Sequence, residues 1–285
     1  QISIDEACVD ITGMGDPSRI ARTLQDDIRN TLGLPSSIGI ATNKLMAKIA
    51  TDVGKKNGPK ARPPNALTII PEGQEEAFLA KLPAEMLWGV GPKTAQRLKE
   101  HGILTIGDIA SHPVADLERW FGEMGVELWR HAHGIDERPI VTEYEAKSIS
   151  QETTFAHDVT DDQVLKRTLR ELSAKVGHRL RKDDLAGQTV KIKVRWPDFT
   201  SLTRQVTQPD PIDQDDEIYS IALDLFLKVR PGGKAVRLIG VGVSGFTSPV
   251  RQLSLWDGND EKRRKLQEVL DELQEKYGRN VIRRG

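Results

Sequence analysis

The spacing of apolar residues predicts short strands that alternate with amphipathic helices in the first seventy residues. Residues 9–12 alternate apolar and polar side chains, which predicts a strand, and residues 37–41 predict another. Residues 16–33 predict a helix that has a capping aspartate, a first-turn proline and a terminal glycine, and residues 43–53 predict a second helix. The apolar stripe of the first helix is Ile20, Leu24 and Ile28. This order predicts an α+β layer.

From about residue 75 to residue 143 the pattern is wholly helical. Within it, Gly89 and Gly91 form a Gly-x-Gly turn that runs through a proline directly into a helix. The first turn of such a helix exposes backbone N–H groups, which together with the helix dipole attract anions. Lys93 adds positive charge at the same end. The pattern predicts a helix-hairpin-helix element, which grips the DNA backbone without reading bases.

After a polar linker, the pattern predicts the order β-α-β-β-α-β. Thr160 and Gln163 have the spacing of a capping box at the start of the first of these helices, and an apolar stripe follows. A sheet of this kind has two helices on one face and leaves the other face open. The predicted strands cover residues 148–155, 188–196, 201–207 and 235–243, and the helices cover residues 160–180 and 213–231.

One of these strands carries a regular stripe of positive charge. Lys191, Lys193 and Arg195 alternate with apolar residues and therefore point to one face, and Arg204 lies on the next strand. Solvation of an open face is one interpretation. A nucleic-acid backbone that lies across the strand explains three cations in register more economically.

Composition bounds the possible functions. The chain has 285 residues, enough for two or three domains, with 38% hydrophobic and 29% charged residues. It contains no apolar run long enough to span a bilayer, so we expect no membrane association. Its single cysteine forbids an internal disulfide and fits the reducing cytoplasm. A net charge of −1 does not exclude nucleic acid as a partner, because segregated charges matter more than their sum.

The strongest candidate for chemistry is the acidic pair Asp5 and Glu6. Adjacent carboxylates repel each other unless a positive charge lies between them, and Mg²⁺ binds through one or two carboxylates plus substrate phosphates. For a lone pair, a solvated acidic turn is the more frequent explanation. The remainder of the chain reverses that preference and favours a metal site.

The order of these features resembles the Y-family translesion DNA polymerases, most closely the bacterial DNA polymerase IV type. The resemblance covers essentially the whole chain. It implies an α+β, multidomain protein with a partial palm at residues 1–82, a helical thumb at residues 83–146, a little finger at residues 147–246 and a tail at residues 247–285. Its most specific strings are Ser3-Ile4-Asp5-Glu6-Ala7, Asn43-Lys44-Leu45-Met46-Ala47-Lys48-Ile49-Ala50-Thr51-Asp52, Trp88-Gly89-Val90-Gly91-Pro92-Lys93 and Lys147-Ser148-Ile149-Ser150.

The resemblance also implies a role for each candidate residue. Asp5 and Glu6 would hold two Mg²⁺ ions in a two-metal nucleotidyl transfer, and Lys55 would contact the incoming deoxynucleoside triphosphate. The thumb hairpin, with Gly89, Gly91, Lys93 and Thr94, would hold primer-template DNA, and the little finger would contact phosphates through Lys191, Lys193, Arg195 and Arg204. A tail motif resembles the segment that docks in the sliding clamp (beta clamp), with Trp in place of Phe: Gln252, Leu253, Leu255 and Trp256.

The sequence departs from the family most strongly at its front. The family's first metal-binding aspartate, its steric-gate aromatic and its fingers precede the Ser-x-Asp-Glu motif, and this sequence has none of them. We expect that the front of a longer protein is missing, because a strand that begins at its catalytic residues is an unusual start. Cys8 also stands where the family usually has Tyr.

The leading hypothesis is a template-directed DNA polymerase for translesion synthesis, acting as a cytoplasmic monomer. The alternative is a catalytically incomplete module that binds DNA and the sliding clamp. A third interpretation concerns the tail alone, whose apolar residues Leu253, Leu255 and Trp256 would pack within the chain instead of entering a partner.

Overall fold

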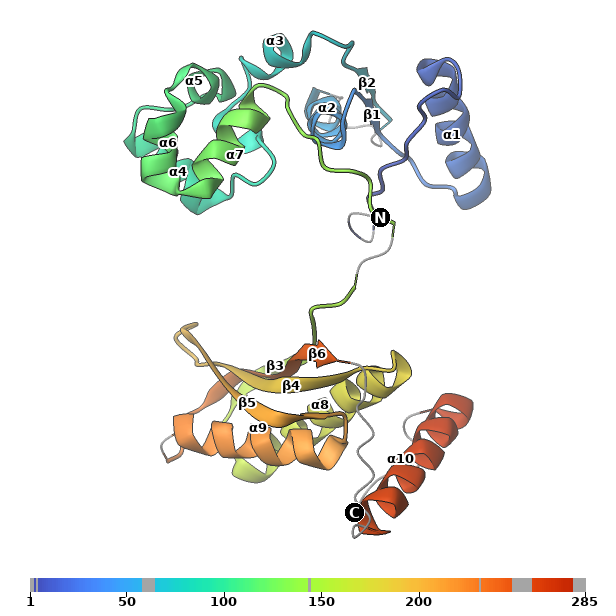
Figure 1. Cartoon of the computed structure of the whole chain (residues 1–285), viewed down its shortest axis with the longest axis vertical. Helices are drawn as coiled ribbons and strands as arrows, with labels where there is room; N and C mark the ends of the chain where they lie inside the picture. Colours follow the sequence, from blue (N-terminus) through green and yellow to red (C-terminus); the bar gives the residue numbers. More distant parts are fainter. Residues whose placement is uncertain are drawn as a thin grey trace. The chain divides into compact units, whose positions relative to one another are not determined.

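The structure is a computed structural model, and it describes residues 3, 5–57, 65–142, 145–230, 232–247 and 258–278. The chain divides into two compact units, Gln1–Glu143 and Tyr144–Gly285 (Figure 1). Each unit is described by itself.

The first unit begins with an irregular segment that leads into α1 (Pro17–Leu32). The helix starts where the Asp16 carboxylate accepts a hydrogen bond from the Ser18 backbone N–H at 3.0 Å, and it ends at Gly33, as predicted. Two members of the predicted apolar stripe, Ile20 and Ile28, are half-buried, but Leu24 is 43% exposed, and the buried positions are Ala21 and Gln25. The buried Gln25 side chain donates a hydrogen bond to the Ser36 carbonyl at 2.9 Å.

The predicted strand over residues 9–12 is wrong. This segment has no strand assignment, and Val9 is 66% exposed. A strand is defined by hydrogen bonds to a neighbouring strand. The described part of this unit contains a two-stranded sheet whose strands pair only with each other. Alternation of side chains alone therefore does not produce a strand here.

That sheet is parallel and lies against α2 (Lys44–Asn57), which packs on both strands (Figure 1). It consists of β1 (Ile38–Ile40) and β2 (Leu67–Ile69). The strand β1 and the helix were predicted, although α2 continues beyond its expected end. Asn43 begins α2 by accepting a hydrogen bond from the Met46 N–H at 3.0 Å, and its amide donates to the Gly134 carbonyl at 2.8 Å.

The remainder of the first unit is helical, as predicted. A single core cluster runs from Leu45 and Ile49 of α2 to Leu128 of α7, so the predicted palm and thumb share buried contacts within the described residues. The division between them near residue 82 stays a prediction. The helices are α3 (Glu75–Leu79), the 3-10 helix η1 (Ala84–Met86), α4 (Pro92–Glu100), α5 (Ile106–Ser111), α6 (Val114–Phe121) and α7 (Glu123–Ala132).

The second unit has the predicted β-α-β-β-α-β order. Its strands form one antiparallel sheet in the order β3-β6-β4-β5, and α8 and α9 cover one face (Figure 1). β3 and β5 extend past their predicted ends. The elements are β3 (Ser148–Val159), α8 (Asp162–Lys182), β4 (Ala186–Arg195), β5 (Ser201–Ile212), α9 (Asp215–Val229) and β6 (Val236–Thr247).

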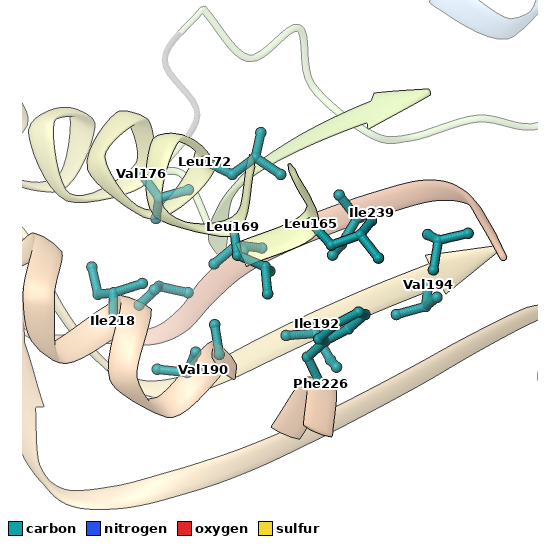
Figure 2. Packing of buried hydrophobic residues seen from close by; sticks show 14 of the residues in the cluster. Leu165, Leu169, Leu172, Val176, Val190, Ile192, Val194, Ile218, Phe226 and Ile239 are labelled. Atoms are coloured by element: carbon teal, nitrogen blue, oxygen red, sulfur yellow. The ribbon is translucent and has the colours of Figure 1, made fainter. Parts of the chain in front are cut away.

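The core of this unit lies between the sheet and the two helices (Figure 2). The stripe of α8 meets the apolar residues of β4, and residues such as Leu169 and Ile192 are 1% exposed or less. The predicted capping box at the start of α8 is wrong. Asp161, one residue later than predicted, caps the helix by accepting from the Gln163 N–H at 2.7 Å. A carboxylate at this position also complements the helix dipole, which favours it over the threonine.

The last described element is α10 (Gly258–Tyr277), which contacts α8 through an ion pair. Arg181 of α8 donates to Asp271 of α10 at 2.7 Å. Among the described residues, no helix combines the length and apolar character that crossing a membrane requires.

Candidate functional site

The two carboxylates of the acidic pair have different surroundings. Asp5 is exposed, and its Oδ1 accepts a hydrogen bond from the Ser3 hydroxyl at 2.7 Å. Glu6 is 25% exposed and lies against two lysines of α2: its Oε1 is 2.8 Å from Lys48 Nζ and 3.6 Å from Lys55 Nζ. The structure thus brings together three residues that the sequence assigned to the site, Asp5, Glu6 and Lys55.

Helix α2 positions the basic side of this site. Lys48, Asp52 and Lys55 are four and three residues apart, so they lie along one face of the helix. Lys48 Nζ donates to both Asp52 oxygens, at 3.0 and 3.1 Å, as well as to Glu6. Neither Lys48 nor Asp52 was predicted from the sequence to have a role in the site. Their helical spacing was visible in the sequence, but the contact between Lys48 and Glu6 was not.

These contacts keep the carboxylates ionised. The hydrogen bond from Ser3 lowers the pKa of Asp5 below its ordinary value. The hydrogen bond from Lys48 lowers the pKa of Glu6, and the charge of Lys55 contributes. Burial alone would lower the pKa of Lys48, but its hydrogen bonds to Glu6 and Asp52 outweigh that effect and raise it. At neutral pH the site therefore holds charged groups of both signs.

The donor chemistry of the acidic pair suits a hard divalent cation. No group of three or more potential metal-ligating side chains (His, Cys, Asp or Glu) occurs among the described residues. Two adjacent carboxylates nevertheless match the way Mg²⁺ is usually held, by one or two carboxylates together with water and substrate phosphates. Asp5 is the more accessible of the two, because it is exposed, whereas Glu6 is 25% exposed and paired with Lys48.

A second candidate surface is the turn that precedes α4. Gly89 has φ +98°, a conformation that side-chain-bearing residues rarely adopt, so the fold itself requires glycine there. Gly91 has φ −81° and caps α4 without a side chain, and a Cβ built on it would meet nothing within 4 Å. Lys93 is exposed and Thr94 half-buried in the first turn of the helix. The structure brings these four predicted residues together at one helix N-terminus.

The open face of the second unit's sheet carries the predicted cationic stripe. Lys191, Lys193 and Arg195 lie opposite Gly242, Gly240 and Leu238 of β6. Their apolar neighbours on β4 are buried under the helices, which confirms the predicted alternation. Residues opposite each other on paired strands share a face.

Arg204 does not belong to this stripe. It lies opposite Ile192, whose side chain is buried beneath the helices, so the register places Arg204 on the helix-covered face at the edge strand. The residues of β5 that share the face of the stripe are Ser201, Thr203 and Gln205. Side chains alternate between the two faces along a strand, so Arg204, which lies between Thr203 and Gln205, points to the face opposite the stripe.

The predicted clamp-binding residues lie outside the described residues, and the structure does not test their role. They are Gln252, Leu253, Leu255 and Trp256.

Comparison with known proteins covers most of the chain. Residues 1–52 match the model of the impB/mucB/samB family, and residues 146–255 match the impB/mucB/samB family C-terminal domain. Residues 85–136 match the model described as DNA polymerase-iota, thumb domain. A DNA polymerase IV from Desulfatibacillum aliphaticivorans is 38% identical over 289 residues, which span 99% of this chain and 71% of that protein. The chain belongs to the Y-family DNA polymerases.

Other members support the same assignment. DNA polymerase IV 1 of Bacillus subtilis (strain 168) is 36% identical over 293 residues, covering 100% of this chain and 69% of that protein. A solved Y-family DNA polymerase chimera of Dbh and Dpo4 superposes with a TM-score of 0.66 at 24% identity, over 79% of this chain and 63% of that chain, which shows a shared fold. A ternary complex of Dbh superposes with a TM-score of 0.52 at 25% identity, covering 83% of this chain and 69% of that chain.

Proposed function

We propose that this chain carries the template-directed DNA polymerase activity of its family in translesion synthesis, with Asp5 and Glu6 as carboxylates of the catalytic centre. The observation that carries the proposal is the geometry of the acidic pair. An accessible Asp5 and a lysine-bound Glu6, both within the segment that matches the family model, lie beside Lys55. Members of the family use divalent metals, and we propose two Mg²⁺ ions here. The ions would supply activation of the primer hydroxyl and neutralisation of charge on the triphosphate.

Each residue of the site has a distinct part in this proposal. Asp5, fixed by Ser3, holds the accessible ligand position, and Glu6 supplies the second carboxylate. Lys55 is 39% exposed and 3.6 Å from Glu6, so its ammonium is near the acidic pair yet open to an incoming triphosphate. A lysine there neutralises phosphate charge as a point charge.

The two basic surfaces fit primer-template DNA as the macromolecular substrate. The N–H groups at the start of α4, next to Gly91, Lys93 and Thr94, suit a phosphate of the primer backbone. The stripe of Lys191, Lys193 and Arg195 suits further phosphates. Within this scheme we assign the palm to residues 1–82, the thumb to residues 83–146 and the little finger to residues 147–246. We also propose that the protein acts as a cytoplasmic monomer.

The deciding experiment is Mg²⁺-dependent primer extension by this polypeptide beside its Asp5→Ala and Glu6→Ala variants. Asp10→Ala is the matched control, since it removes an exposed aspartate of the same segment whose carboxylate accepts the Thr12 N–H. We expect extension by the unaltered chain and by the control, and none by the two site variants, while all four bind DNA equally. Retained extension in either site variant would refute the assignment of that carboxylate.

Failure of the unaltered chain to extend a primer while it still binds DNA would favour the second candidate, a non-catalytic DNA- and clamp-binding module. The observation that favours this second candidate is that the described residues offer two carboxylates at the site and no group of three or more metal-ligating side chains.

A clamp contact is a separate part of the proposal, and its support is the sequence motif alone. A tether of this kind raises the effective concentration of a weakly bound polymerase at the primer end. We expect binding to the sliding clamp to be lost when Leu255 and Trp256 are both changed to Ala. Clamp binding that survives this change would mean that these side chains pack within the chain.

A further inference from the structure

Lys48 is the most extensively bonded cation of the acidic site. Its ammonium donates to Glu6 at 2.8 Å on one side and to both Asp52 oxygens at 3.0 and 3.1 Å on the other. Its side chain is 20% exposed, about half the exposure of Lys55 at 39%. Lys48 is therefore bonded to carboxylates on two sides, whereas Lys55 lies 3.6 Å from Glu6.

We infer that Lys48 is a positioning residue that occupies the cation position on Glu6 until a divalent ion displaces it, and that Asp52 retains Lys48 when this happens. The inference rests on the proposed function, which makes Asp5 and Glu6 metal ligands. It assigns a task to Lys48 and Asp52, to which the proposed function gives no contact with metal or substrate.

The charge of Glu6 is already neutralised by Lys48. An ammonium in hydrogen-bond contact with Oε1 provides the positive charge that two adjacent carboxylates need. A divalent ion that approaches Glu6 must therefore compete with Lys48. The competition is weaker at Asp5, where the described side-chain donor is the uncharged Ser3 hydroxyl and the two lysines act through their charge alone. The two carboxylates are thus unequal: Asp5 accepts an ion directly, and Glu6 accepts one only when Lys48 yields.

Lys48 keeps a charged partner, Asp52, when it leaves Glu6. An ammonium has three donors and no acceptor, and here Asp52 already offers it two oxygens. Asp52 lies one turn along α2, so the same rotamer of Lys48 can keep the Asp52 contact while Glu6 is released. Asp52 thereby lowers the preference of Lys48 for Glu6. Lys48 and Asp52 should then affect cation binding in opposite directions.

The test is a titration with Mn²⁺ alone, followed by electron paramagnetic resonance, on the full chain without DNA or nucleotide. We expect Lys48→Gln to bind Mn²⁺ at least about threefold more tightly than the unaltered chain, because the competitor is gone. Asp52→Asn should bind it about threefold more weakly, because Lys48 then has Glu6 as its remaining charged partner. Lys48→Arg should stay close to the unaltered chain, since it restores the competing charge.

Two comparisons separate this arrangement from a general charge effect. Lys44→Gln removes the same charge one turn earlier on α2, where Lys44 donates to the Pro139 carbonyl at 2.8 Å, and it should change Mn²⁺ affinity far less. In a double-mutant cycle, Asp52→Asn should lose its effect once Lys48 is Gln, because Asp52 acts only through Lys48. Additive effects would overturn the inference.

Equal Mn²⁺ affinity of Lys48→Gln and the unaltered chain, including no binding by either, would also overturn the inference. Its failure is distinguishable from failure of the proposed function, because the titration contains no DNA. If the titration gives the expected affinities but the chain extends no primer, the role of Lys48 is supported and the proposed polymerase activity of this chain is refuted.

Discussion

Lys193 and Glu152 form an ion pair across a glycine of the central strand. Lys193 on β4 and Glu152 on β3 both lie opposite Gly240 of β6, and the Lys193 Nζ is 2.8 Å from the Glu152 Oε2. Because Gly240 has no side chain, the two can meet over it; a Cβ there would lie 2.9 Å from the Glu152 Cβ. One cation of the stripe proposed to bind DNA is therefore paired with an acid when DNA is absent.

We predict that Glu152→Gln strengthens DNA binding. The exposed pair that Lys193 must give up is worth about 0.2–1 kcal/mol, which corresponds to a gain of about 1.5- to 5-fold in affinity. Freeing one more phosphate contact should also steepen the dependence of log K on log salt concentration by about 0.9. Fluorescence anisotropy with a labelled duplex at several salt concentrations measures both quantities.

Glu171→Gln is the matched control for this change. Glu171 is exposed on α8, which covers the opposite face of the sheet. The substitution therefore removes the same charge as Glu152→Gln without freeing Lys193. Equal gains in the two variants would show that net charge, and not the pair across Gly240, sets the affinity.

Gly91→Ala should separate DNA binding from folding. The new methyl group meets no atom within 4 Å and the backbone has φ −81°, so we expect the free energy of unfolding to change by less than about 1 kcal/mol. The methyl group would instead keep a phosphate from the N–H groups of α4. Loss of one charge-assisted hydrogen bond, about 1.5 kcal/mol, would weaken DNA binding about tenfold.

The control for this prediction is Gly232→Ala in the second unit, where a Cβ also meets nothing within 4 Å. It should leave both stability and DNA affinity unchanged. If Gly91→Ala binds DNA as well as the unaltered chain, the turn before α4 is not a phosphate site.

What the sequence could predict follows from the range of the interactions involved. The stripe of α8 and the alternation of β4 were correctly predicted, because each depends on residues close together in the chain. Arg204 was predicted to lie on the next strand without being assigned a face, and its face depends on which residue of β4 it lies opposite. Lys48 was overlooked for a related reason: its partner Glu6 lies 42 positions away in the sequence.

The start of α5 is held by a side-chain cap. The Thr105 hydroxyl accepts the Asp108 N–H at 3.0 Å, and the Asp108 carboxylate accepts the Thr105 N–H at 2.8 Å, which forms a capping box at the start of α5. Thr105→Ala should cost about 1 kcal/mol in thermal or chemical unfolding, while Thr105→Ser keeps the cap and should cost less. Equal losses in the two variants would mean that the methyl group, not the hydroxyl, stabilises this turn.

The docking of α10 should weaken in acid, because its anchor is a carboxylate. Burial alone would raise the pKa of Asp271, but the hydrogen bonds and charge of Arg181 outweigh it and lower the pKa below its ordinary value. A carboxyl whose folded pKa is depressed contributes stability above its unfolded pKa of about 3.9 and loses it as pH falls through the folded pKa. The helix should therefore be docked at pH 7 and released progressively below about pH 4.

Asp271→Asn imitates the protonated carboxyl at neutral pH. We expect faster amide hydrogen exchange along α10 in this variant, because Arg181 loses a partner at 2.7 Å while it stays buried beside Asp215. Glu272→Gln is the control, since Glu272 is the exposed neighbour on the same helix. Unchanged protection of α10 in Asp271→Asn, or the same loss in both variants, would show that apolar contacts and not the Arg181–Asp271 pair hold this helix against α8.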